Sequence, residues 1–201
     1  MAVVQSSETA RQISPEAAGR LSRRGRVRTG IFVMGVVLFL AVGVQAQSAG
    51  EYQVKAAFLY NFAKFVEWPQ SGFSDGSAPI RICVFGQDPF GQELRDITSG
   101  KTVNGRKLQV DQVADLQMAR GCHILFVASS EKSQLKHILE SVRGACVLTV
   151  GDTKGFVDQG GMINFVLENE RVQFEVNHKA AEQAGLKVSS KLLSVAKLVV
   201  E

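Results

Sequence analysis

Three histidines are the side chains of this 201-residue chain best suited to metal binding or acid–base chemistry. His123 lies within an apolar run, His137 lies in a segment with helical spacing, and His178 follows another apolar run. Glu175 and His178 are the one pair with metal-ligand spacing, and two ligands without further ones do not make a metal site. The sequence therefore predicts neither a metal centre nor a bound cofactor.

Hydroxyl and glycine-rich segments give no better case for catalysis. Ser189, Ser190 and Lys191 are consecutive, and adjacent side chains on a helix point apart, so a helix cap explains them better than a nucleophile and its base. The segment from Gly86 to Gly91 lacks the Gly-Lys-Ser/Thr ending of a phosphate-binding loop. We therefore predict a protein that is not an enzyme.

The elements that position these residues alternate between strand and helix. Apolar runs predict buried strands at Ile80–Phe85, Arg106–Val110, His123–Ala128 and Ala145–Val150. Capping residues and glycines predict intervening helices that start at Asp88-Pro89, span Asp115–Arg120 and span Ser130–Val142. This alternation is typical of a single-domain α/β fold, a doubly wound, Rossmann-like, three-layer arrangement with a mostly parallel sheet.

The last quarter of the chain departs from that pattern. Met162–Leu167 and Val172–Val176 flank Asn169-Glu170, which predicts a β-hairpin. Two helices are expected after it, over Lys179–Ala184 and Ser190–Val199.

Small polar residues follow the predicted parallel strands, where ligands collect in open α/β sheets. They are Asp88, Ser129, Ser130, Asp152 and Thr153. Their position supports one reading of the function, a small-molecule sensor or binding protein with its ligand at the strand ends.

The segment Glu51–Pro69, EYQVKAAFLYNFAKFVEWP, is too apolar for an ordinary surface helix. Its apolar residues cover an arc of roughly 200°, whereas one core-facing side needs about 100°. The excess is explained either by two packing faces within the fold or by a partner or second copy. Trp68-Pro69 should end the helix, because proline disfavours α geometry in the residue before it.

Residues 1–46 have the pattern of a secretory signal peptide with a long basic n-region. Five arginines between Arg20 and Arg28 precede the apolar run Ile31–Val44, and small residues place cleavage near Ala46. The alternative of an uncleaved anchor is weaker, because 14 helical residues reach about 21 Å across a hydrocarbon core of about 30 Å. Residues 47–201 would then form one periplasmic domain.

The apparent basicity of the chain comes from this leader. It contains six of the 23 Lys and Arg residues and two of the 19 Asp and Glu residues, which leaves 17 of each in the predicted mature chain. A chain without net charge or a basic run offers little attraction to nucleic acid, so we expect none as a partner.

Four segments carry a family resemblance: KAAFLYNFAKFVEWP, GGMINF, FEVN and GLKVSSKLLSVAKLV. In their order and spacing they resemble the YfiR family of periplasmic repressor proteins. The resemblance implies that the chain binds the periplasmic sensor part of an inner-membrane diguanylate cyclase. By doing so it would repress cyclic-di-GMP synthesis and with it biofilm-type signalling. It also implies that an outer-membrane lipoprotein of peptidoglycan-binding type can sequester the repressor.

A protein of this kind works through its surfaces rather than through an active site. We expect partner or homodimer contacts on an exposed flank of the first helix, formed by Tyr52, Leu59, Tyr60, Ala63 and Lys64. Further contacts are expected at Glu175 and Asn177. Glu175 is an acidic group on an apolar hairpin, so it is either a specificity contact or the cap or salt-bridge partner of a neighbouring helix.

The three cysteines fit an oxidising compartment in part. Cys83 and Cys122 lie on strands that become neighbours if the sheet has the 2-1-3 order, and the resemblance implies that they form one of the family's disulfides. Cys146 would then be a buried free thiol. The second bridge found in family members has no cysteine here, since residues 156–165 contain none.

Overall fold

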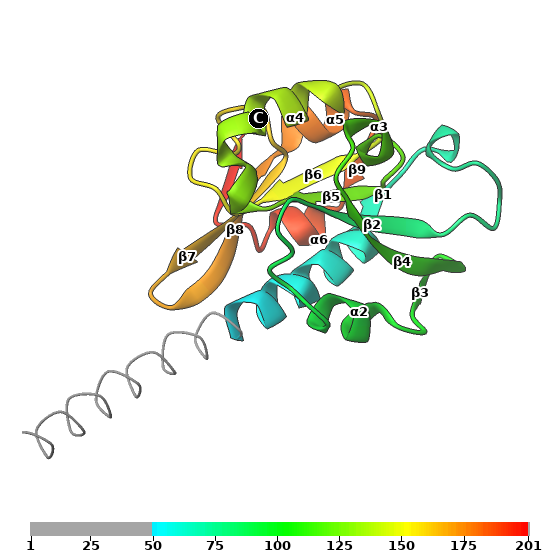
Figure 1. Cartoon of the computed structure of the whole chain (residues 1–201), viewed down its shortest axis with the longest axis horizontal. Coiled ribbons are helices and arrows are strands. Elements are labelled where there is room, and N and C mark those ends of the chain that lie inside the picture. The colour runs from blue at the N-terminus through cyan, green and yellow to red at the C-terminus, as the bar shows by residue number, and fades with distance from the viewer. Residues whose placement is uncertain (1–49, 201) are drawn as a thin grey trace, which may run out of the picture. The chain divides into compact units, whose positions relative to one another are not determined.

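An eight-stranded sheet forms the middle layer of the described chain, with helices on both of its faces (Figure 1). The computed structural model describes residues 50–200, so the predicted leader lies outside the described residues. The strands, in chain order, are β2 (Ile80–Phe85), β3 (Thr102–Val103), β4 (Arg106–Val113), β5 (Ile124–Val127), β6 (Leu148–Gly151), β7 (Ile163–Glu168), β8 (Arg171–Asn177) and β10 (Leu198–Val200). Their order across the sheet is β10-β8-β7-β6-β5-β2-β4-β3.

The register of the central strands confirms the predicted topology. Ile82 of β2 pairs with Val110 of β4 on one side and with Ile124 of β5 on the other, and both pairings are parallel. The first strand of the parallel set therefore lies between the second and the third, which is the 2-1-3 order. The expected hairpin is also present, because β7 and β8 pair antiparallel through a two-residue turn at Asn169 and Glu170.

Side chains that alternate along the strands divide the core into two layers. Ile82, Phe126 and Val150 belong to a cluster with the N-terminal helix, which covers residues 50–65. That cluster also includes Leu94 of α2 (Glu93–Thr98) and Leu192 of α6 (Ser190–Leu193). On the opposite face, Cys83 and Leu125 pack against α3 (Leu116–Ala119) and α4 (Leu135–Ser141). The three-layer prediction is confirmed.

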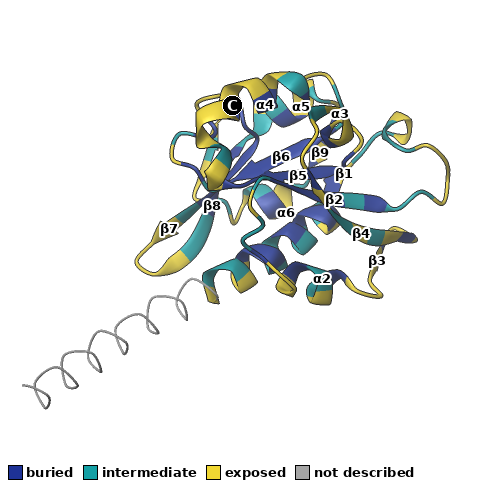
Figure 2. Cartoon of the chain, viewed as in Figure 1, coloured by how far each residue is buried: buried dark blue, intermediate teal, exposed yellow. Residues whose placement is uncertain are grey.

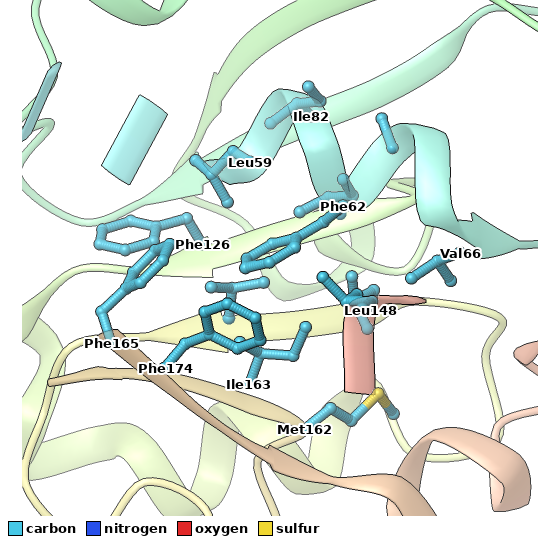
Figure 3. Packing of buried hydrophobic residues seen from close by; sticks show 14 of the residues in the cluster. Leu59, Phe62, Val66, Ile82, Phe126, Leu148, Met162, Ile163, Phe165 and Phe174 are labelled. Carbon is cyan, nitrogen blue, oxygen red and sulfur yellow. The ribbon is translucent and has the colours of Figure 1, made fainter. Parts of the chain in front are cut away.

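The N-terminal helix buries one side along its whole length and is half-buried or exposed on the other (Figure 2). Phe62 stacks on Phe165 of β7 with ring centroids 5.7 Å apart, and its ring meets that of Phe174 of β8 edge-on at 5.3 Å. Figure 3 shows these rings converging below the helix, where Leu148 and Ile163 complete the floor. The wide apolar arc thus packs largely within the chain.

The expectation that Leu59 and Ala63 lie on an exposed flank is wrong. Both residues have no exposed surface, and both belong to the cluster that holds Leu94 of α2 and Leu192 of α6. The helix therefore packs against the sheet and two further helices, and its exposed residues are Gly50, Gln53, Val54 and Lys64.

Helix ends and the C-terminus show further differences from the prediction. The final helix stops at Leu193, and its expected second half forms β10, which pairs with β8 and begins after Lys197 donates its amide to Phe174 O at 2.8 Å. The predicted helix start at Asp88 is also wrong, because α2 begins only at Glu93 and the Asp88 carboxylate accepts from Phe90 N in a turn.

The bounds of other helices and strands differ less from the prediction. The predicted helix Ser130–Val142 begins as a 3-10 segment (Ser129–Gln134) before α4, and β6 begins at Leu148 rather than Ala145. Asp115 caps α3 as expected, with its carboxylate accepting from Gln117 N at 2.7 Å, and α5 (His178–Gln183) follows β8. A short second sheet joins β1 (Val66–Glu67) to β9 (Lys187–Val188). Within residues 50–200, no helix combines the length and the apolar character needed to span a membrane.

Candidate functional site

Cys83 and Cys122 form a disulfide, as the family resemblance implied. The bridge joins β2 to the residue pair just before β5, and the two Cα atoms are 6.0 Å apart. Cys146 is free and only partly buried, so the expectation of a fully buried thiol is wrong.

A buried ion pair connects the N-terminal helix to the end of β6. Lys55 Nζ lies 2.8 Å from Asp152 Oδ2, and the side chains of the two residues are 5% and 6% exposed. Lys55 Nζ also lies 2.6 Å from Glu51 Oε1. Asp152 was expected at an open ligand loop, but its carboxylate is enclosed beneath the helix.

Tyr52 completes this buried cluster. Its hydroxyl donates to Asp152 Oδ2 at 2.8 Å, and its ring meets Phe90 edge-on at 5.5 Å. Burial, followed by the hydrogen bond to the Asp152 carboxylate, raises the pKa of the Tyr52 hydroxyl. Its polar end therefore points into the fold and away from the surface on which we expected a partner.

The other strand-end residues are largely occupied by contacts within the chain. Ser130 Oγ accepts from Gln87 N at 3.0 Å and donates to Glu131 Oε1 at 2.9 Å. A Cβ atom on Gly86 would lie 2.6 Å from Ser130 Oγ, so the gap between the ends of β2 and β5 is filled. Asp88 Oδ2 lies 3.6 Å from Arg95 Nη1, and Thr153 is buried. Ser129 and Ser130 are the two exposed members of the set. Ligand binding at these loops stays a prediction.

Tyr60 and Lys64 form the accessible part of the expected helix surface. Lys64 is exposed, and its Nζ lies 5.4 Å from the centre of the half-buried Tyr60 ring. This geometry is a cation–π contact that holds an aromatic and a charged group together at the surface.

Glu175 and Asn177 lie on β8 and are half-buried. Asn177 caps α5, because its Oδ1 accepts from Ala180 N at 2.9 Å. Glu175 makes no ion pair with any residue from 50 to 200. Its neighbour on the adjacent strand β10 is Leu198. The salt-bridge explanation of Glu175 is therefore not supported within the described chain, and its role as a contact stays a prediction.

Sequence reasoning missed an apolar groove of about 430 Å³ between the start of the N-terminal helix and the hairpin. Val54 and Leu167 line it and are 45% and 53% exposed, with Phe58 and Val172 beside them. Charged side chains at its rim include Glu51, Glu170 and Arg171. The sequence signal was the position of Val54 and Phe58 on the apolar arc, but it could not show which part of the arc the hairpin leaves open.

His123 has a structural role at the edge of the core. Its Nδ1 accepts from Arg81 N at 3.0 Å, and its ring stacks on Phe73 with centroids 4.4 Å apart. Burial lowers the pKa of His123 to about 4, so the imidazole is neutral at neutral pH. No group of three or more His, Cys, Asp or Glu side chains in residues 50–200 could hold a metal ion.

Comparison with known proteins identifies a family. A family model described as YfiR/HmsC-like matches residues 52–197. No curated protein matches the chain.

Two solved structures resemble the chain in part. A conserved domain protein from Vibrio cholerae O1 biovar El Tor strain N16961 is 12% identical with a TM-score of 0.47, over 60% of this chain and 54% of that one. An ABC domain from Streptococcus pneumonia in complex with L-Trp is 10% identical with a TM-score of 0.44, over 60% of this chain and 55% of that one. The chain thus spans little more than half the length of either structure.

Proposed function

The chain belongs to the YfiR/HmsC-like family, and from this membership we propose that it represses a membrane-bound diguanylate cyclase by binding the cyclase's periplasmic sensor domain. Members of the family are periplasmic, non-catalytic regulators of diguanylate cyclases. The observation that carries the proposal is the family match over residues 52–197, which covers nearly all of the described chain. Repression would lower cyclic-di-GMP and with it biofilm-type signalling.

The surface proposed for the cyclase combines the exposed stripe of the N-terminal helix with the groove beside it. Tyr60 and Lys64 offer an aromatic and a cationic contact, and Val54 and Leu167 offer apolar surface that a partner can bury. Aromatic and apolar anchors surrounded by charged groups are typical of protein interfaces. Glu175 remains a proposed specificity contact at the hairpin.

Release of the cyclase requires a competing partner. We propose that an outer-membrane, peptidoglycan-binding lipoprotein takes this role, as the family resemblance implied. Such a partner can shift the balance only through its own affinity for the repressor.

The proposal is tested by export of the full chain with its own leader, followed by capture on the periplasmic domains of the organism's membrane-bound diguanylate cyclases. Lys64→Glu should abolish capture by one of these domains while circular dichroism shows an unchanged fold. The matched control is Lys136→Glu, because Lys136 is also exposed but lies on α4, on the opposite face of the sheet. Failure of every cyclase domain to capture the wild-type protein would overturn the proposal.

A further inference from the structure

A second cavity, of about 340 Å³, is lined by residues from the end of α4 and from α5. Figure 1 shows these two helices next to each other. None of Asp88, Ser129, Ser130, Asp152 and Thr153 lines the cavity, although Gln159 and Gly160 come from the same connection between β6 and β7 as Asp152 and Thr153. Its volume falls at the lower end of the range for small-molecule sites. Neither the family membership nor the proposed cyclase contact requires it.

The floor of this cavity is aliphatic. Leu139 and Val142 line it from α4 and its C-terminal cap, Met162 lines it from the start of β7, and Ala180 and Ala184 line it from α5. No aromatic side chain contributes to the lining. An apolar group of a ligand would therefore contact aliphatic side chains, and the small alanine side chains leave space for a branched alkyl group.

The rim of the cavity is cationic. Arg143 and Lys179 line it from opposite elements, both are exposed, and no Asp or Glu contributes to the lining. Neither cation forms an ion pair with any residue from 50 to 200. The acidic residue of α5, Glu182, instead lies 3.8 Å from His178. Two cations in a lining that contains no carboxylate favour an anion at this cavity.

A buried polar group lies between the floor and the rim. Thr149 is 2% exposed, and its Oγ1 accepts from Met162 N at 3.1 Å. Its hydroxyl hydrogen finds no acceptor among the described residues, so the group can still donate to a ligand oxygen.

We propose that this cavity binds a small aliphatic carboxylate, with the carboxylate between Arg143 and Lys179 and the branched apolar end on Leu139, Val142 and Met162. Charge-assisted hydrogen bonds orient the anion, and burial of the apolar end supplies the remaining affinity. The cavity shares Asn177 with the partner contacts expected from the sequence, but it includes no residue of the N-terminal helix or of the apolar groove. Binding there would make the protein a carboxylate-binding protein in its own right.

The test is an NMR titration of the isotope-labelled protein recovered from the periplasm, with isovalerate as the probe. Isovalerate should shift the amide resonances of Gly144, Gly160 and Ala180, with a dissociation constant on the order of millimolar. Isoamyl alcohol has the same apolar end without the charge, and acetate has the charge without the apolar end. Each should bind at least about tenfold more weakly.

Two variants locate the site. The double variant Arg143→Gln/Lys179→Gln should weaken isovalerate binding at least about tenfold, and Ala184→Leu should block it by filling the cavity. The matched control is Lys132→Gln/Lys136→Gln, which removes two exposed cations outside the lining and should leave binding unchanged. No shift at the cavity amides, equal binding of the alcohol, or undiminished binding by both cavity variants would each overturn the proposal.

Discussion

Lys55 Nζ contacts Asp152 Oδ2 at 2.8 Å, which joins the first helix of the described chain to the end of a central strand 97 residues later. Both side chains are almost fully buried, and Tyr52 donates to the same carboxylate oxygen. Replacing one residue of such a pair leaves the charge of the other residue in the core. Replacing both residues by neutral ones leaves no buried charge.

The ion pair predicts strong coupling between two substitutions. Lys55→Met should lower the free energy of unfolding by about 3 to 5 kcal/mol, because it leaves the buried Asp152 carboxylate without a cation. Asp152→Asn should lower it by less, because Lys55 keeps its ion pair with Glu51. The double variant should lose clearly less than the sum of the two, as urea unfolding can measure. Strict additivity of the two losses would show that the pair is not coupled.

His123 predicts a defined pH dependence of stability. Its pKa is lowered to about 4 in the folded protein, whereas an unfolded histidine titrates near pH 6.5. The unfolded state therefore binds more protons in this window, so the stabilising contribution of His123 is complete above about pH 6.5 and is lost as the pH falls towards 4.

Urea unfolding at a series of pH values checks this effect against His123→Gln, which keeps an acceptor for Arg81 N but cannot titrate. The difference between wild type and variant should change between about pH 6.5 and 4 and level off below that. His137→Gln, at an exposed helical histidine, is the matched control. An identical pH profile for wild type and His123→Gln would contradict the prediction.

The disulfide predicts a loss of stability on removal. Its cysteines are 39 residues apart, a loop for which the chain-entropy estimate is roughly 3 to 4 kcal/mol. Cys83→Ala/Cys122→Ala should lower the free energy of unfolding by about that amount, and reducing agent should then have no further effect on the variant. Cys146→Ala should keep the sensitivity of the wild type to reducing agent, because Cys146 is free.

Leu59 and Lys64 lie on the buried and the exposed side of the same helix. Leu59→Ala should cost about 2 to 5 kcal/mol of unfolding free energy because it opens a cavity, whereas Lys64→Ala should change it by less than about 0.5 kcal/mol. A small effect of Leu59→Ala in thermal or urea unfolding would argue against the packing seen here.

The hairpin turn offers a stabilising substitution. Asn169 and Glu170 have φ values of 49° and 62°, a left-handed conformation that suits asparagine and glycine but not glutamate. Glu170→Gly should raise the free energy of unfolding by about 1 kcal/mol, and Glu170→Ala should give no such gain. Equal stabilities of the glycine and alanine variants would contradict the strain argument.

Local patterns predicted much of the fold because they act over short distances. Apolar runs and capping residues such as Asp115 indicated the central strands, the helices between them and the hairpin. The segment after Leu193 was misread because Val199 and Val200 suit a strand as well as a helix end, and only pairing with β8 decides between them.

The candidate site was harder to predict because its features are non-local. Lys55 was visible as an isolated charge on an apolar arc, but nothing near it in the chain indicates Asp152. In the same way, the arc could not show that Leu59 is covered while Val54 stays open. Burial by distant elements leaves no local trace in the sequence.

The packing of Phe62 on Phe165 also has a consequence for the order of folding. A periplasmic chain that crosses the membrane with its amino end first delivers the N-terminal helix well before the hairpin that covers it. Closing so long a loop is slow, because its entropy is lost before the contacts form. In a chain exported as proposed, this aromatic face would stay exposed until the hairpin arrives, and it is the segment that a periplasmic chaperone would have most reason to hold.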